Sequence, residues 1–198
     1  MNFDPPPEGF LRDIRAQALC FGVDVNTDDI IPSNNLQNID IQFLATKAMS
    51  GLRPTFYEEV RALGGCILIG GVNFGSGSSR EQAVDCLKAA RVLAVVADSF
   101  RPIFFDNAFN VGLPVLAVPN IRAGVTERDV LHVDIENARV CNETTGRVFE
   151  GTALPPVGLA KLRQGGLLGN LRRYILDHGM DRPYESAADY APRCTPRL

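Results

Sequence analysis

Apolar residues along the chain fall into short unbroken runs and longer stretches with a helical period. The unbroken runs at 66–69, 92–97 and 114–118 predict strands that are buried on both faces. Between them, the periodic stretches predict helices over 78–91 and 102–111. Because strands and helices alternate, parallel pairing is favoured, and the pattern predicts an α/β core.

The segments that flank this core carry further patterns. The expected elements are a strand over 17–25, helices over about 39–49 and 54–63, a half-exposed strand over 131–136 with His132 on its wet face, a hairpin turning at 142–146, and helices over about 156–164 and 167–177. The domain organisation predicted from these patterns is a Pro-rich arm over 1–16, one domain over 17–178 and an extended tail over 179–198.

The composition is that of a packed globular protein. Of 198 residues, 45% are hydrophobic and 22% charged, which is enough to bury a stable core in one domain. The net charge of −3 offers no electrostatic footprint for nucleic acid. The longest apolar run, 92–97, is far shorter than the roughly 20 residues that span a bilayer. We therefore expect a cytoplasmic protein with no nucleic-acid or membrane partner.

The five cysteines lie far apart in the sequence and form no CxxC pair. Local spacing therefore predicts neither a zinc site nor an iron–sulfur site in this chain. Cys66 lies in an apolar run and Cys86 in a helical pattern, so both are expected to be buried, reduced thiols.

Residues 73–81 (NFGSGSSRE) are the stretch most typical of a functional site. They leave a predicted buried strand and enter a predicted helix, where free backbone N–H groups and the helix dipole favour an anion. Glycines allow the backbone to approach a ligand closely, and Arg80 adds a planar fork suited to a carboxylate or a phosphate. The residues alone thus predict an anion-binding loop.

Three interpretations of this loop compete. A dinucleotide fingerprint would use Gly75, Gly77 and an acid such as Asp98, but Arg80 occupies the third glycine position. A Walker loop is excluded because no Gly-Lys-Ser/Thr occurs. A capping box with Ser78 as N-cap and Glu81 three residues later explains those two residues. It leaves the glycines, the second serine and Arg80 without a role.

The third interpretation rests on resemblance. Residues 73–81 resemble the signature of 3-isopropylmalate dehydratase small subunits, which are swivelling domains of the aconitase superfamily. The stretch 24–32 (DVNTDDIIP) is similar to the family's first motif, and 97–107 through 112–115 to its third. Three motifs in this order, within a match from about 17 to 177, make the resemblance specific.

The resemblance implies a three-layer β/β/α swivelling domain that works only with a separate large subunit. That partner would hold a [4Fe–4S] cluster, and the pair would isomerise a small 2-hydroxy dicarboxylate by dehydration and rehydration. By the same resemblance Ser78 is the general base, Asp28 lies near the active site, and Gly77, Ser79 and Arg80 belong to the substrate-binding loop. A non-catalytic nucleotide- or anion-binding module remains the alternative of another class.

The loop 33–38 departs from the pattern by which the family chooses its substrates. Relatives that act on isopropylmalate or homoaconitate usually place a basic residue and an aromatic one where this chain has Asn34 and Asn35. Homoaconitate enzymes tend to carry arginine at the position of Gln37. Asn34 and Gln37 are therefore expected to face the variable group of the substrate. Methylmalate or citraconate, dimethylmalate and homoaconitate remain alternatives to isopropylmalate.

Overall fold

The computed structural model describes residues 6–178 and arranges them around one seven-stranded sheet. The strands follow the order β4-β3-β2-β1-β5-β6-β7 across the sheet. Their bounds are β1 Ile14–Cys20, β2 Cys66–Gly70, β3 Val92–Ala97, β4 Val115–Ala117, β5 Val130–Asp134, β6 Arg139–Asn142 and β7 Arg147–Glu150. Strands β1 to β4 pair in parallel, as the sequence predicts, whereas β5 to β7 are antiparallel.

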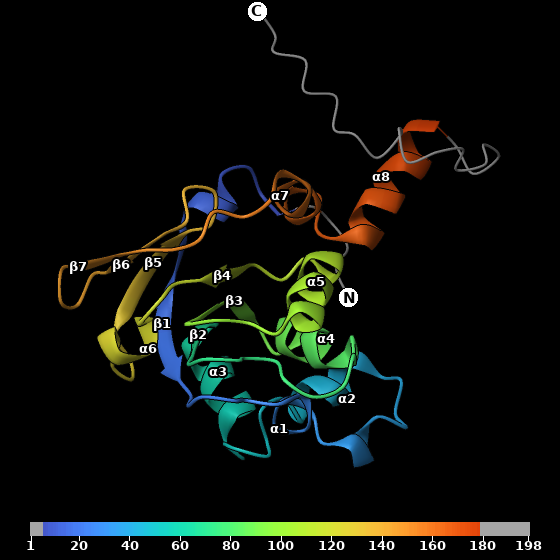
Figure 1. Cartoon of the computed structure of the whole chain (residues 1–198). Helices are drawn as coiled ribbons and strands as arrows, with labels where there is room; N and C mark the ends of the chain where they lie inside the picture. Colours follow the sequence, from blue (N-terminus) through green and yellow to red (C-terminus); the bar gives the residue numbers. More distant parts are fainter. Residues whose placement is uncertain (1–5, 179–198) are drawn as a thin grey trace, which may run out of the picture.

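The architecture has three layers, which Figure 1 shows as the β5–β7 hairpins, the parallel strands and a group of helices. The helices are α1 Thr27–Ile30, α2 Ile41–Thr46, α3 Phe56–Leu63, α4 Gln82–Ala89, α5 Pro102–Val111, α6 Ile121–Gly124, α7 Pro156–Arg163 and α8 Leu167–His178, with 3₁₀ turns η1 Phe10–Arg12 and η2 Ser33–Asn35. The three-layer α/β swivelling fold expected from the resemblance is confirmed.

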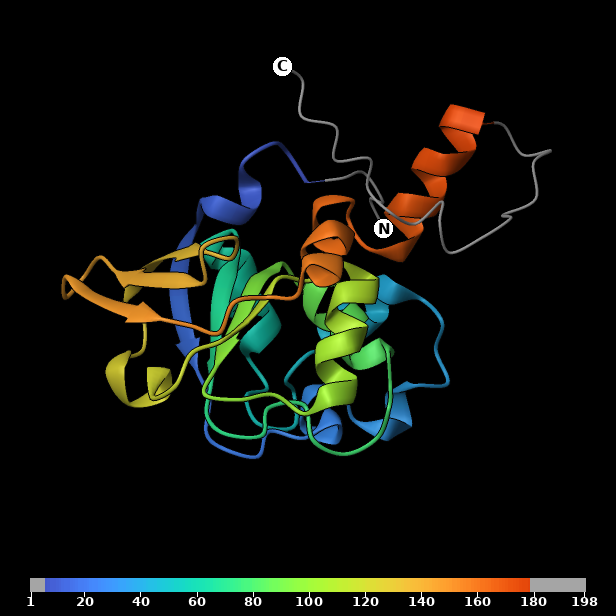
Figure 2. The same cartoon turned by 45° about the horizontal axis from the view of Figure 1, so that its top comes forward.

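The chain after β7 connects the two ends of the sheet. The N–H of Gly151 donates to Ala138 beside β6, and the N–H of Thr152 donates to Ala117 in β4. Figure 2 shows this segment crossing over the parallel strands towards α7. The sheet is therefore curled rather than open, and the outer β layer is fixed over the parallel strands.

The first strand differs from the prediction at both ends. Ile14 is buried and pairs with Val133, so β1 begins within the segment assigned to the arm. The strand ends at Cys20, although Phe21 still donates to Ile69 of β2 and Asp24, in the left-handed region at φ 53°, donates to Val72 just after β2. Residues 21–25, expected as strand, are instead a loop beyond the carboxyl end of β1. The expected tail over 179–198 lies outside the described residues.

The other expected elements are confirmed with shifted ends, except for the helix expected from residue 78, which is treated below. His132 is half-exposed and its Nε2 lies 3.0 Å from the carbonyl of Arg12, in agreement with a wet face. Cys66 and Cys86 are buried free thiols, and burial raises the pKa of Cys66 to about 12. Within residues 6–178, no helix combines the length and apolar character needed to cross a membrane.

Candidate active site

Three loops meet where the parallel strands β1, β2 and β3 end. The N–H of Gly75, in the loop after β2, donates to Val25 in the loop after β1, over 2.8 Å. On the other side, the N–H of Arg101 after β3 donates to the carbonyl of Phe74 over 2.9 Å. These backbone bonds hold the loops in fixed register, so residues far apart in sequence form one surface.

Helix α1 is a single turn whose start is fixed by its own side chains. Asn26 caps it by accepting the N–H groups of Asp28 and Asp29, and Asp29 accepts the N–H of Asn26 in return. This reciprocal capping box satisfies the first free donors of the helix. It thereby sets the directions in which Thr27 and Asp28 leave the turn.

The loop after β2 remains non-helical through Ser78, contrary to the prediction of a helix from that residue. Helix α4 begins at Gln82, its N-cap position is Glu81, and no side chain caps it. The capping box predicted for Ser78 and Glu81 is therefore wrong. Gly77 has φ 102°, a conformation outside the helical region, and the contacts with α1 keep the chain extended here.

Ser78 instead contacts Thr27. The hydroxyl of Thr27 accepts the N–H of Ser78 over 3.1 Å and lies 3.2 Å from the Ser78 hydroxyl. Thr27 is only 1% exposed, whereas Ser78 is exposed. A side chain at Gly77 would place a Cβ 2.9 Å from the Thr27 hydroxyl, so this approach requires glycine. Local sequence patterns do not identify Thr27 as part of the site, because its contact with Ser78 joins residues 51 positions apart.

Arg80 and Asp28 form the charged part of the site. The Nη1 of Arg80 donates to Oδ1 of Asp28 over 2.5 Å. This hydrogen bond lowers the pKa of Asp28 below its ordinary value, with further help from the Arg80 charge and from Ser33, although desolvation acts in the opposite direction. Asp28 is therefore a carboxylate at neutral pH, and it orients the guanidinium.

The remaining predicted residues lie around this centre. Ser79 is exposed, and its carbonyl accepts a hydrogen bond from Asn107 of α5 over 3.3 Å. Asn34 and Gln37 are exposed on the segment that follows α1. Ser33, at the start of this segment, also helps to lower the pKa of Asp28. The structure thus brings Ser78, Ser79, Arg80 and Asp28 together, with the loop 33–38 beside them.

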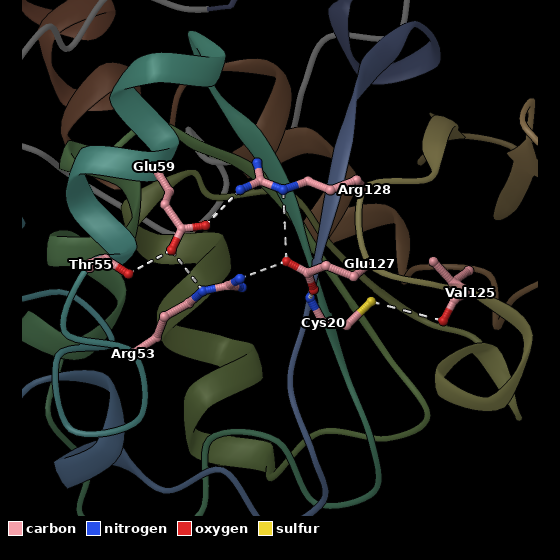
Figure 3. Close-up of polar contacts among 7 residues, drawn as sticks. All are labelled: Cys20, Arg53, Thr55, Glu59, Val125, Glu127 and Arg128. Carbon is pink, nitrogen blue, oxygen red and sulfur yellow. Dashed lines mark hydrogen bonds and ion pairs between the residues drawn. The ribbon is translucent and has the colours of Figure 1, made fainter.

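A charged network lies beside α3 and the end of β1, as Figure 3 shows. Arg53 donates to Glu59 over 3.0 Å and to Glu127 over 2.8 Å, and Arg128 donates to Glu59 over 2.6 Å. The other oxygen of Glu127 accepts the N–H of Cys20, the last residue of β1, over 2.8 Å. The network thereby joins α3, the end of β1 and the loop before β5.

Backbone bonds connect this network to α1. The N–H of Arg53 donates to the carbonyl of Met49, and the N–H of Met49 donates to the carbonyl of Ile30 at the end of α1, over 2.8 and 2.7 Å. The segment 49–53 therefore lies between the ion pairs and the helical turn that carries Thr27 and Asp28. Its position depends on both.

The dinucleotide interpretation is not supported by the geometry. Arg80 occupies the place of the third glycine and pairs with Asp28. Asp98, the acid that would hold a ribose, accepts the N–H of Arg122 at α6 over 3.1 Å. The third glycine of the fingerprint is thus replaced by a paired arginine, and the acid that it requires is engaged in a contact within the protein.

The described cysteines, histidines and carboxylates do not gather at one point. Among residues 6–178, no group of three or more His, Cys, Asp or Glu side chains is arranged to hold a metal ion. The four described cysteines are free and come from separate elements. Their donor sets do not fit an iron–sulfur cluster, which requires several thiolates at one point.

Several known proteins are similar to this chain in sequence. Residues 35–120 match the family model of the aconitase C-terminal domain. The 3-isopropylmalate dehydratase small subunit of Pyrobaculum neutrophilum is 47% identical over 159 residues, covering 80% of this chain and 96% of the relative. The isopropylmalate/citramalate isomerase small subunit of Methanocaldococcus jannaschii is 41% identical over 164 residues, covering 83% and 96%.

A solved structure is also similar. A crystal structure of a 3-isopropylmalate dehydratase from Methanocaldococcus jannaschii superposes with a TM-score of 0.77 at 32% identity, covering 83% of this chain and 96% of that one. The segment 35–120 that matches the family model contains the loops after β2 and β3. Similarity therefore extends to the loop that carries Ser78 and Arg80.

Proposed function

Because the chain belongs to the family of 3-isopropylmalate dehydratase small subunits, we propose that it completes the active site of a hydro-lyase together with a large subunit. The enzyme removes water from a 2-hydroxy dicarboxylate and adds it back at the neighbouring carbon, through an alkene intermediate. The observation that carries the proposal is the cluster of Ser78, Arg80 and Asp28, which the hydrogen-bonded segments after β2 and β1 bring together. For isopropylmalate, this isomerisation is a step of leucine biosynthesis.

In this proposal Ser78 is the general base. The proton to be removed is bound to carbon beside a carboxylate and is a poor acid, so a strong base such as a serine alkoxide is needed. The alkoxide requires hydrogen-bond donors and positive charge nearby, in a site from which water is excluded. Arg80, oriented by Asp28, supplies the charge and binds a substrate carboxylate together with Ser79.

The large subunit is needed for two reasons. Ser78 and Ser79 are exposed in this chain, so a second surface must cover them to exclude water. In the complex a [4Fe–4S] cluster held by the large subunit supplies Lewis-acid chemistry, since the described residues of this chain offer no ligand set for it. Exposed apolar side chains of Val23, Val72 and Ile103 at the edge that carries the loops support docking of a partner there.

The substrate follows from the loop 33–38. Relatives named for isopropylmalate support that substrate, and the relative named for isopropylmalate and citramalate supports the smaller 2-methylmalate as a second candidate. Asn34 and Gln37 are uncharged, so they supply no positively charged partner for a third carboxylate. We therefore favour 2-alkylmalates over homoaconitate. The free cysteines support a cytoplasmic location.

Reconstitution tests this function. The chain, tagged and expressed at its native level, is expected to co-purify with a larger, brown, oxygen-sensitive partner. Neither protein alone should dehydrate 2-isopropylmalate or 2-methylmalate, and activity should appear when the two are mixed anaerobically. A colourless monomer that binds NAD would support the nucleotide-binding alternative instead, and iron–sulfur absorbance in the pure chain would contradict the assignment of the cluster to the partner.

A further inference from the structure

Thr27 is a buried hydroxyl placed directly against the proposed base. Its Oγ1 lies 3.2 Å from Oγ of Ser78 and accepts the N–H of Ser78 over 3.1 Å. The residue is 1% exposed, and its own N–H donates to Ser76 over 2.7 Å. Because threonine is branched at Cβ, its χ1 is restricted, and the position of Oγ1 is fixed by the backbone of α1.

The hydrogen-bonding capacity of the two hydroxyls determines which of them is the donor. A hydroxyl has one proton and two lone pairs, and Thr27 uses a lone pair to accept the N–H of Ser78. Its proton remains free to donate to Oγ of Ser78. When Ser78 is an alkoxide it has no proton, so the bond between the two oxygens can form only with Thr27 as the donor.

We infer that Thr27 is a positioning residue for Ser78: its hydroxyl donates a hydrogen bond to the Ser78 oxygen while that oxygen is an alkoxide. The inference rests on the proposed function. In the reaction Ser78 takes the carbon-bound proton and becomes a hydroxyl, and the C–H electron pair forms the double bond as the substrate hydroxyl leaves. Thr27 keeps its own proton throughout, and the Ser78 proton is returned on rehydration.

The Thr27 hydrogen bond acts on the negative charge of the Ser78 alkoxide. Ser78 is charged before proton transfer and neutral after it, so the donor stabilises the reactive form of the base and holds its oxygen in one direction. Hydrogen bonds to charged groups are stronger than neutral ones, and Thr27 is shielded from water. The substrate carboxylate binds elsewhere, at Arg80. Loss of the donor should therefore reduce kcat and leave KM almost unchanged.

Thr27→Val and Thr27→Ser separate this role from a structural one. Valine keeps the branched shape and removes the hydroxyl, whereas serine keeps the hydroxyl. In Thr27→Val the loop is still held by the Gly75–Val25 and Thr27–Ser76 backbone bonds and by the Arg80–Asp28 pair. Arg80 should then stay in place, so a change in KM reports displacement of the loop and a change in kcat reports the lost donor.

The experiment uses the reconstituted complex with 2-isopropylmalate and 2-methylmalate. Thr27→Val is expected to lose about 100-fold in kcat with KM within about threefold, because loss of a hydrogen bond to a charged group lowers the share of Ser78 that is an alkoxide. Thr27→Ser should recover most of the activity. Thr144→Val is the matched control, since its hydroxyl also accepts a backbone N–H, from Val130, but in the β6–β7 turn. It should keep the parent kcat.

Several outcomes overturn the inference. The first is an unchanged kcat in Thr27→Val, and the second is a defect of this variant that consists only of a higher KM. The third is a Thr27→Ser variant that is as impaired as Thr27→Val. If Thr27→Val does not fold or does not bind its partner, as judged by melting temperature and gel filtration, Thr27→Ala is held to the same criteria. A parent complex without dehydratase activity contradicts the proposed function itself, and the inference falls with it.

Discussion

Arg80 donates through Nη1 to Oδ1 of Asp28 over 2.5 Å, and this pair joins the loop after β2 to the helical turn after β1. Arginine carries five N–H donors in a planar fork, so one contact with Asp28 leaves donors for a ligand carboxylate. The aspartate therefore fixes the direction of the fork without consuming it. The main effect of the pair is to orient Arg80, because an exposed ion pair adds little to the stability of the fold.

The Asp28→Asn substitution tests this orientation. We expect kcat/KM of the reconstituted complex to fall about tenfold or more, since an amide holds a guanidinium less firmly than a carboxylate does. The melting temperature should be unchanged within error because the pair is exposed. Asp177→Asn, which alters the exposed Arg173–Asp177 pair on α8, is the matched control for charge. Parent-like kinetics in Asp28→Asn would show that Arg80 needs no partner.

Ser78→Ala tests the base. We expect a loss of about 10²–10⁴-fold in kcat, the range for removal of a general base. The melting temperature and the affinity for the large subunit should stay close to those of the parent, because Ser78 caps no helix and is exposed. Ser76→Ala removes a neighbouring hydroxyl with only a 3.4 Å contact to Asp24 and should remain active. Turnover of Ser78→Ala within about tenfold of the parent would exclude the base role.

The core of the fold was predictable because burial dictates it. The apolar runs at 66–69 and 92–97 are the strands β2 and β3, and all residues of β2 are buried. The hydroxyl-rich loop was also recognisable as a candidate site, from its glycines and Arg80. What local rules could not supply was the start of α4, since the tertiary contact between Thr27 and Ser78 overrides the local capping signal.

Local sequence patterns also could not predict how the two ends of the sheet are joined. The bond from Thr152 to Ala117 joins the two ends of the sheet, and the pattern of each segment alone contains no sign of it. The same holds for the contact of Asn107 with the carbonyl of Ser79. Both depend on how the elements are arranged in three dimensions. The pattern predicts the strands of the outer β layer, but only the resemblance to a family could anticipate that they form a separate layer over the parallel strands.

Gln37→Arg tests whether the loop 33–38 selects the substrate. A new guanidinium should favour a substrate with an additional carboxylate by about 1.5–3 kcal/mol, or more than tenfold in relative kcat/KM. The measurement compares 2-isopropylmalate with a tricarboxylate analogue in the reconstituted complex. Asn38→Arg adds the same charge one residue further along the exposed loop and should change the ratio less. Equal ratios in both variants would mean that Gln37 does not face the substrate.

The network around Glu59 predicts how stability depends on pH. The hydrogen bond from Thr55 lowers the pKa of Glu59, and Arg53 and Arg128 lower it further against the effect of desolvation. A carboxyl whose pKa is lower in the folded protein than in the unfolded chain stabilises the fold above its unfolded pKa. That contribution disappears as the pH falls through the folded pKa, which lies below the ordinary value of 4.5.

Glu59→Gln should therefore unfold more easily than the parent at pH 7, by about 1–3 kcal/mol, because Arg53 and Arg128 lose their common partner in a half-buried site. The difference from the parent should shrink steadily between about pH 5 and pH 3, where the parent carboxylate is itself protonated. Urea unfolding of both proteins across this range measures it. Glu58→Gln, the exposed neighbour on α3, is the matched control and should follow the parent at every pH. A Glu59→Gln deficit that stays constant down to pH 3 would mean that packing, and not the charge of Glu59, stabilises this part of the fold.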